Sequence, residues 1–138
     1  MILKDAATDV DFWAMVADMD WAGNGFDYDA IGARVAKRLV DEYGVQQAAD
    51  ISGRMHRALM MKEWALRRVI CRHPAYKELY GDSLDDLVAH IVGLGQGYYE
   101  QVMADAGVAK NLDYRESFAY CFHAMDEIGR TDAAAEVG

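Results

Sequence analysis

The segment VQQAADISGRMHRALMMKEWALRRVICR, residues 45–72, decides the fold class of this protein. Its apolar side chains recur every three or four residues, the spacing that places them on one face of an α-helix. Pro74 disfavours helical geometry at His73 and therefore ends the element. The apolar face is formed by Ile51, Met55, Leu59, Leu66 and Ile70, and Met60 and Trp64 widen it.

Shorter helical patterns flank this segment on both sides, the first over about residues 9–20. Each has a polar residue that can cap its N-terminus and a residue that can stop it. Ser52-Gly53 marks a point where the long helix bends or begins again. The expected caps are Thr8, Asp27, Ser83 and Asp113, and the expected stops are Gly44, Pro74, Gly107 and Gly129.

Three glycines interrupt the pattern that starts after Ser83 and continues toward Met103. A glycine inside a helix costs up to about 1 kcal/mol relative to alanine, so three need a reason. Either Gly93 and Gly97 admit a neighbouring helix closely, or the helix breaks near Gly95. A phosphate-binding loop is the less favoured alternative, because the spacing is G-x-G-x-G and no strand precedes it.

The whole pattern predicts an all-α protein, a single-domain bundle of five or six helices over residues 1–138. Its ordered core is expected over about residues 8–129, with a frayed tail at 130–138. A single proline suits helices, and a hydrophobic content of 53% excludes intrinsic disorder. No run of residues alternates as a strand would.

Charge is distributed unevenly along a chain whose net charge is −9. Residues 51–77 carry seven bases and one acid, and both flanking segments are acidic. The simplest interpretation is a basic helix that pairs with the surplus acids of its neighbours. The overall acidity argues against nucleic-acid binding, which depends on phosphate neutralisation. Without an apolar leader or a membrane-length apolar run, and with only two cysteines, the sequence predicts a cytoplasmic protein that binds no membrane.

Several short motifs occur in a recognisable order. They are Phe12-Trp13, residues 59–70 around Trp64, Ser83-Leu84-Asp85-Asp86-Leu87, Ile91-Val92 followed by Gly95 and Tyr99-Glu100, and Phe118-Ala119-Tyr120. In these motifs, residues 11–128 resemble a bacterial domain-of-unknown-function family that opens with a Phe-Trp pair. Some of its members sit beside WGR domains or carry the label "molybdenum metabolism regulator". The resemblance implies a helical fold and brings no catalytic residues with it.

A ligand site is predicted where the basic helix meets the helix that carries the glycines. Arginine forks suit carboxylates and phosphates, and helical bundles build sites from facing helices. A histidine in the core or at its edge remains the simpler interpretation of His90. The six candidate residues are Arg54, Arg57, Trp64, Arg68, His90 and Tyr99.

Two Cys-x-His units, Cys71-Arg72-His73 and Cys121-Phe122-His123, could together supply a Cys₂His₂ zinc set. Residues two apart in a helix point about 200° apart, so one unit cannot place both side chains on one ion. Residues 20–31 resemble a calcium loop but place Ile31 where a bidentate Glu is required. The sequence therefore predicts no metal and no cofactor.

The leading hypothesis for function is a non-enzymatic, acidic helical accessory, regulatory or immunity-type protein that binds another protein. It rests on the acidity, the eight tyrosines and the absence of a catalytic motif. The alternative is a small-molecule or anion-binding domain, which leaves an enzyme of unknown class open. A third possibility is a homodimer that uses Met60, Met61 and Trp64.

Overall fold

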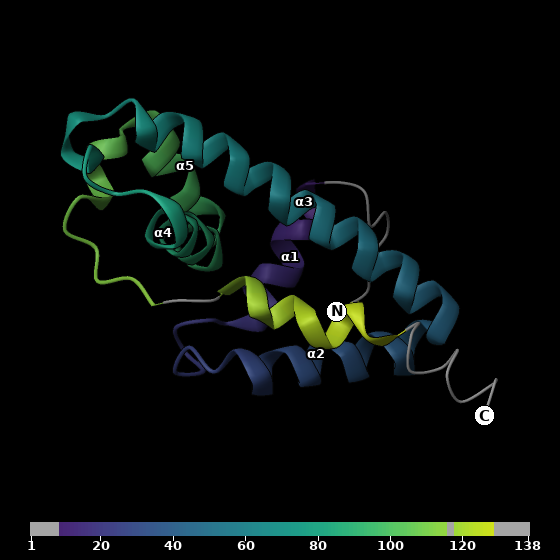
Figure 1. Cartoon of the computed structure of the whole chain (residues 1–138). Helices are drawn as coiled ribbons and strands as arrows, with labels where there is room; N and C mark the ends of the chain where they lie inside the picture. The colour runs from purple at the N-terminus through teal and green to yellow at the C-terminus, as the bar shows by residue number, and fades with distance from the viewer. Residues whose placement is uncertain (1–8, 116–117, 129–138) are drawn as a thin grey trace.

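The longest helix of the computed structural model lies across all the others (Figure 1). The structure describes residues 9–115 and 118–128, and within them it has six α-helices and no strand, which confirms the all-α prediction. Three 3₁₀ turns link or precede the helices. The helices are α1 (Asp9–Met19), α2 (Tyr28–Tyr43), α3 (Val45–Cys71), α4 (Gly81–Gly93), α5 (Gln96–Ala104) and α6 (His123–Asp126), and the turns are η1 (Pro74–Tyr76), η2 (Ala106–Ala109) and η3 (Phe118–Phe122).

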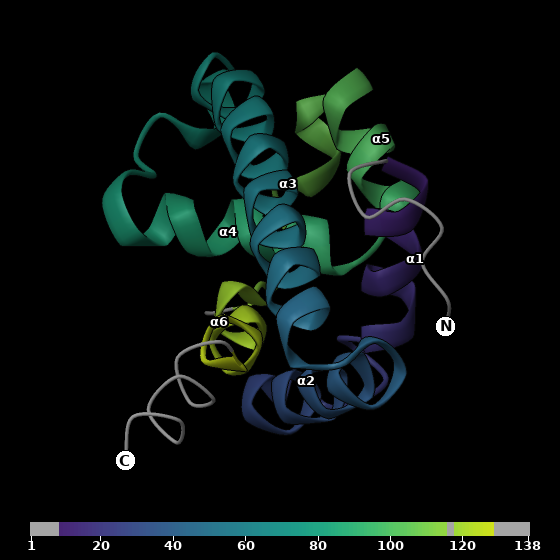
Figure 2. The same cartoon turned by 90° about the vertical axis from the view of Figure 1, so that its right-hand side faces the viewer.

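Helix α3 organises the packing. It has 27 residues and is therefore about 40 Å long, and it contacts each of the other five α-helices. Figures 1 and 2 place α2 and α6 under its N-terminal half, and α4 and α5 under its C-terminal half. Its buried face consists of Ala48, Ile51, Ser52, Met55, Leu59, Leu66 and Ile70.

The predicted apolar face of α3 is confirmed at its centre and wrong at its edges. All five residues that define it are buried, whereas Met60 and Trp64 are 59% and 56% exposed. The predicted weak point at Ser52-Gly53 does not interrupt the helix. Ser52 is buried, and its hydroxyl lies 3.5 Å from Oδ1 of Asp126 in α6.

Helix α2 has a capped N-terminus, ends at a glycine, and contacts the C-terminal end of α1 through an arginine. Asp27 caps α2 as predicted, because its Oδ1 accepts the backbone N–H of Ala30 at 3.1 Å, and Gly44 ends the helix with a φ of 79°. The Arg34 guanidinium donates to the backbone carbonyls of Asp18 and Met19 at the C-terminus of α1. A cation there complements the helix dipole and satisfies carbonyls that the helix leaves open.

Helix α4 is the most enclosed element, since every residue from Leu87 to Gly93 is buried. Small and β-branched side chains let neighbours approach it from several sides. The predicted cap at Ser83 is wrong, because the helix already begins at Gly81. Extended backbone at Tyr80 and a left-handed φ of 60° at Gly81 turn the chain into the helix without a side-chain cap.

The glycines at the end of α4 and beyond it have different roles. The helix ends at Gly93, and Gly95 takes a φ of 108° before α5 begins, so the predicted break near Gly95 is confirmed. A Cβ at Gly93 would lie 2.6 Å from Cδ1 of Phe118 and 2.9 Å from Cδ1 of Trp21. Gly93 therefore admits aromatic rings rather than a helix backbone. The close-packing prediction is wrong for Gly97, where a Cβ would meet nothing within 4 Å.

The C-terminal part departs furthest from the prediction. Helix α5 already ends at Ala104, and Gly107 lies inside η2, where its N–H donates to Oδ1 of Asp105. Asp113 caps no helix, since residues 113–115 are not helical. The Arg115 N–H donates to Nδ1 of His90 at 3.1 Å. Thr8, Gly129 and residues 130–138 lie outside the described residues.

Candidate functional site

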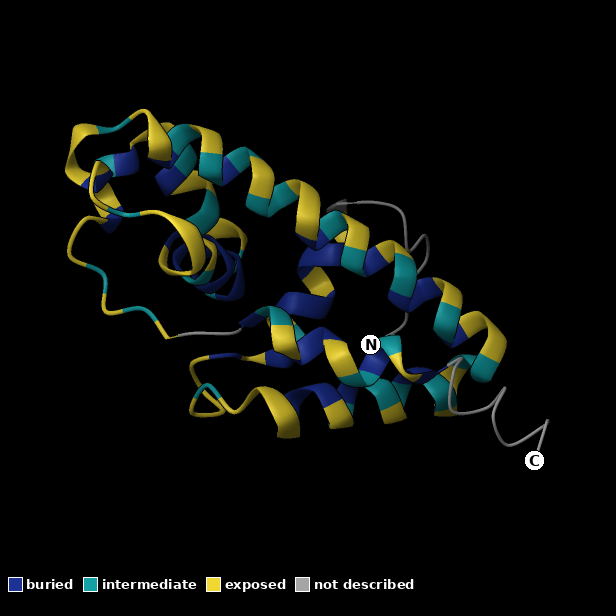
Figure 3. Cartoon of the chain, in the orientation of Figure 1, coloured by how far each residue is buried: buried dark blue, intermediate teal, exposed yellow. Residues whose placement is uncertain are grey.

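Four of the six candidate residues lie on one exposed face of α3. Arg54, Arg57, Trp64 and Arg68 are all exposed, and Met61 fills the gap between them, so that successive positions are three or four apart. Figure 3 shows this edge of α3 largely in the colours of exposed and intermediate residues, away from the packed helices. We call this surface the outer face of α3; it consists of Arg54, Arg57, Met60, Met61, Trp64, Arg68 and Arg72.

The centre of the outer face is apolar. Met60, Met61 and Trp64 expose 59%, 64% and 56% of their surface. The Arg68 guanidinium lies 4.8 Å from the centroid of the Trp64 ring, a cation–π distance. Single exposed apolar residues are common, whereas several that are contiguous and framed by polar groups mark interaction sites.

A hollow of about 230 Å³ adjoins this apolar centre, between α3 and α4. An ion pair between Arg67 of α3 and Asp85 of α4 borders it. The pair joins the two helices at the edge of the hollow. The hollow is lined by Met60, Glu63, Trp64, Arg67, Asp85 and Val88.

Glu63 carries the most perturbed carboxyl group of this region. Burial raises its pKa from the usual 4.5 to about 7, although His56 and Arg67 oppose the rise. Its side chain also lines a second hollow, of about 300 Å³, with Ala89, Ala119 and Tyr120 and the carboxylates of Asp82, Asp85 and Asp86. Near neutral pH the Glu63 carboxyl is therefore partly protonated.

The basic helix pairs with the chain's own acids only in part. Arg54 pairs with Asp50 one turn earlier at 3.1 Å, and Arg67 pairs with Asp85. Within residues 9–115 and 118–128, the three guanidinium groups of Arg57, Arg68 and Arg72 form no ion pair with a carboxylate. These arginines leave a local positive surface on an acidic protein.

The structure does not bring Tyr99 and His90 to this surface. Tyr99 packs against the ring of Trp13 at 5.2 Å, and the ammonium group of Lys62 lies 5.8 Å from the Tyr99 centroid. His90 is 1% exposed and lies in the core. The predicted site therefore separates into a surface on α3, an internal aromatic cluster and a core histidine.

The environment of His90 is structural. Its Nδ1 accepts the indole N–H of Trp21 at 3.0 Å and the backbone N–H of Arg115 at 3.1 Å. Burial lowers the pKa of His90, and the positive charge of Arg115 lowers it further. A neutral ring whose acceptor nitrogen is already bonded has no role as a general base at that atom.

A serine, a histidine and an aspartate meet where α3 contacts α6. Nδ1 of His56 lies 2.9 Å from Oδ2 of Asp126, and the Ser52 hydroxyl approaches the same carboxylate. In a hydrolase the serine would instead bond to the free nitrogen of the histidine. Here both side chains bond to one carboxylate, so the group fastens α6 to α3.

The two cysteines do not form a metal site with their neighbours. Cys71 is exposed at the end of α3, and Cys121 is buried in η3, where burial raises the pKa of its thiol to about 12. Across the described part of the chain, no three His, Cys, Asp or Glu side chains converge to hold a metal ion.

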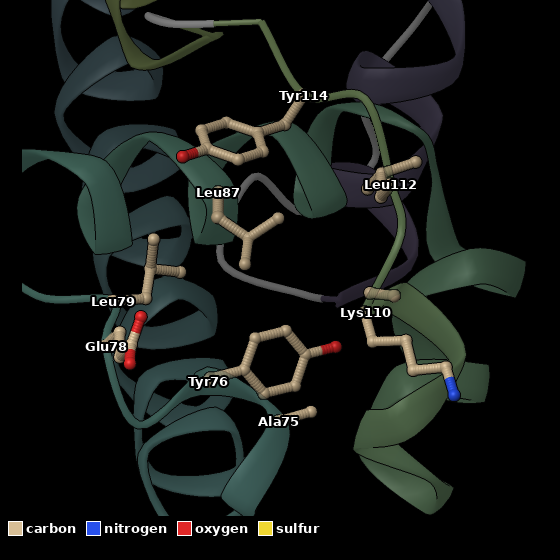
Figure 4. A pocket seen from close by; sticks show the side chains of 9 residues that line it. Ala75, Tyr76, Glu78, Leu79, Leu87, Lys110, Leu112 and Tyr114 are labelled. Atoms are coloured by element: carbon tan, nitrogen blue, oxygen red, sulfur yellow. The ribbon is translucent and has the colours of Figure 1, made fainter.

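An aromatic hollow of about 230 Å³ lies between η1, α4 and the segment after η2 (Figure 4). The rings of Tyr76 and Tyr114 form opposite walls with Leu87 between them. The Tyr76 hydroxyl donates to the backbone carbonyl of Ala106, and the Lys110 side chain extends away from the rings. The lining of this hollow therefore combines aromatic and aliphatic walls with polar groups, which come from the tyrosines, Glu78 and Lys110.

Helical spacing by itself indicates which side of α3 forms the outer face. At about 100° per residue, Met61 lies about 200° around the helix from Leu59 and so opposite the core. Met60 was predicted on the apolar face of the helix, Met60 and Met61 were also predicted in a homodimer interface, and Arg72 is not among the six candidate residues. Val88 and Asp85 belong to another helix, so no spacing within α3 could have revealed the hollow.

Comparison with protein-family models, with curated proteins and with solved structures finds no match to this chain. Within the described residues, no helix combines the length and the apolar character needed to cross a bilayer. The site's own geometry therefore carries the functional argument.

Proposed function

We propose that this protein is a non-enzymatic protein-binding module that docks its partner on the outer face of α3. The observation that carries the proposal is the contiguous exposure of Met60, Met61 and Trp64 between exposed arginines. Tryptophan, methionine and arginine are the residues enriched at the centres of protein interfaces.

The shape of the surface favours a protein over a small molecule. Arg54 lies in α3 and Arg72 directly follows its last residue, eighteen positions later, which corresponds to about 27 Å along the helix axis. A small ligand would cover only a fraction of that length. The adjoining hollow is open beside Trp64 and suits a single side chain projecting from a larger partner.

Charge favours a different protein over a second copy of this chain. A twofold dimer through the outer face would place the Arg57, Arg68 and Arg72 of both copies at one interface. Like charges brought together there oppose association. The apolar centre alone would have to offset that repulsion.

The test uses surface variants in affinity capture from the native host. The double variant Met61→Ser/Trp64→Ser removes the apolar centre, and the control Tyr80→Ser removes an aromatic ring that is 79% exposed elsewhere. We expect one protein to be captured in near-equal amounts by the wild type and by the control, and lost with the double variant. Identifying that protein and reconstituting the purified pair would establish the interaction.

Capture that does not depend on Met61 and Trp64 would contradict the proposal. So would a purified chain that forms a dimer at micromolar concentration, if the same double variant abolished the dimer. Light scattering distinguishes this second outcome, because it reports the mass of the particle directly.

The aromatic hollow of Figure 4 favours a second candidate function, the binding of a small molecule that has both an apolar and a polar part. A thermal-shift screen with aromatic and aliphatic carboxylates tests it. Ligands that raise the melting temperature of the wild type, and not that of Leu87→Phe, would support it. This candidate stands second because the hollow's one buried hydroxyl, on Tyr76, is already bonded to Ala106.

A further inference from the structure

The partner that fits the outer face of α3 is, we infer, an acidic amphipathic helix with an apolar anchor at its centre. The inference rests on the proposed function and adds the chemistry of the partner. Four features of the outer face carry it: its length, the hollow beside it, its charge, and the position of its apolar residues.

The first feature is the geometry of a continuous, uninterrupted helix. Arg57 and Arg72 are fifteen residues apart, or about 22 Å. A partner helix laid alongside α3 has the same rise per residue. Side chains on the partner helix therefore recur at the same spacing along the axis as the side chains of the outer face. Each turn of the partner can contact one turn of α3, as in helix-in-groove recognition.

The second feature is the hollow between α3 and α4. Met60 and Trp64 form its α3 side, and Val88 of α4 lies among its lining residues. Methionine side chains adapt to the shape of what they contact. One leucine or aromatic side chain of the partner would be desolvated there, which makes it the anchor of the interface.

The third feature is the arrangement of charge. Arg57 lies about two turns before Trp64, and Arg68 and Arg72 lie one and two turns after it. Guanidinium forks bind carboxylates in a bidentate manner. Acidic residues one to two turns on either side of the anchor would therefore complement all three arginines.

The net charge of −9 does not outweigh this local surface. At physiological ionic strength charges are screened beyond about 8 Å, so at contact the arginines dominate. Two carboxyl groups line the hollow. Asp85 is paired with Arg67, and the pKa of Glu63, about 7, reduces the negative charge of that side chain near neutral pH. Glu63 therefore opposes an acidic partner less than an ordinary glutamate would.

The fourth feature separates a peptide from a nucleic acid. Met60 and Met61 lie between the arginines, where a phosphate backbone would need further positive charge. An amphipathic helix places apolar side chains at that point. A single-stranded oligonucleotide is accordingly the competitor that the experiment includes.

The experiment selects peptides from a randomised library of sixteen-residue sequences. Selection uses the wild-type chain, and peptides that also bind Trp64→Ser are removed. We expect the enriched sequences to combine one or two large apolar residues with aspartate or glutamate on both sides. For a synthetic copy of an enriched peptide, Arg57→Glu/Arg68→Glu should raise Kd by about tenfold or more.

Matched controls keep the result interpretable. The double variant Lys37→Glu/Lys110→Glu makes the same change in net charge at exposed positions away from the outer face and should leave Kd within about twofold, which shows that position rather than net charge matters. Circular dichroism of each variant verifies that it has folded. Helicity of the bound peptide distinguishes a docked helix from an extended strand.

Three outcomes would overturn the inference. Enriched peptides that are basic or uncharged and still require Trp64 would refute the partner's charge while leaving the proposed function intact. Tighter, Trp64-dependent binding of a twelve-residue oligothymidylate would refute the partner's class. No Trp64-dependent peptide at all would refute a linear helical partner, and the host capture experiment decides the proposed function independently.

Discussion

The indole N–H of Trp21 donates to Nδ1 of His90 at 3.0 Å, a buried hydrogen bond between residues 69 positions apart in the sequence. The same nitrogen accepts the backbone N–H of Arg115. Since Nδ1 acts as an acceptor, the ring proton lies on Nε2. His90 thereby joins the turn after α1, the last turn of α4 and the segment that leads to η3.

Replacing Trp21 by phenylalanine should destabilise the protein by about 1–3 kcal/mol, because His90 loses a buried donor and the core loses volume. The control is Trp64→Phe, which makes a similar change at a residue 56% exposed and should stay within about 0.5 kcal/mol of the wild type. Chemical denaturation of both variants measures the difference. Equal losses of stability in the two variants would show that the hydrogen bond from Trp21 to His90 does not contribute to the free energy of unfolding.

Acid should not protonate His90 at the pH of an ordinary histidine. Burial and Arg115 lower its pKa below 6.5, so below that pH the unfolded chain binds more protons than the folded one. This residue's contribution to stability therefore falls as the pH falls below about 6.5. Nitrogen NMR of the imidazole rings provides the measurement. A His90 ring that becomes protonated at pH 6.5 or above would contradict the described hydrogen bonds.

Two glycine-to-alanine substitutions should have opposite signs. At Gly93 the added Cβ would collide with Phe118 and Trp21, so we expect a loss of about 1–3 kcal/mol. At Gly97, in the first turn of α5, the Cβ meets nothing within 4 Å, and the gain in helix propensity is up to about 1 kcal/mol. Thermal unfolding compares the two. Destabilisation by both would place Gly97 in a packed environment that the structure does not have.

Glu63→Gln should stabilise the protein at alkaline pH. Because the pKa of Glu63 is raised to about 7, the folded chain binds more protons than the unfolded chain between about pH 4.5 and 7. The contribution of Glu63 therefore falls as the pH rises through that window. We expect Glu63→Gln to melt above the wild type at pH 8 and close to it at pH 4.5.

The groups that surround Glu63 define the control for that prediction. His56 and Arg67 favour its charged form, and three aspartates of α4 and Tyr120 line the same hollow. Glu78→Gln removes a charge from an exposed glutamate and should leave the difference between pH 4.5 and pH 8 unchanged. A flat profile for Glu63→Gln relative to the wild type would mean that burial does not perturb this carboxyl group.

Local chemistry made some elements predictable. Asp27 and Gly44 bound α2 because a cap and a left-handed glycine act within one turn. Ser83 and Asp113 also have side chains that can cap a helix N-terminus, but neither of them caps a helix. Helix α4 already begins at Gly81, before Ser83. After Asp113, the backbone N–H of Arg115 donates to His90, which is 25 residues away in the sequence.

The candidate site shows the same contrast between helical spacing, which is local, and contacts that are distant in the sequence. Arg54, Arg57, Trp64 and Arg68 share a face because helical spacing alone places them there. Tyr99 and His90 did not join them, since the packing of Trp13, Lys62 and Trp21 placed them elsewhere. No spacing rule contains those contacts.

By itself the sequence determined that the chain is helical and which side of α3 faces the core, because both follow from the period of its apolar residues. Only the tertiary structure decided that Met60 and Trp64 stay exposed, that α4 is enclosed, and that a hollow opens between α3 and α4. The physical reason is that a helix face is buried only where another element covers it. Which faces are covered depends on contacts between residues far apart in the chain.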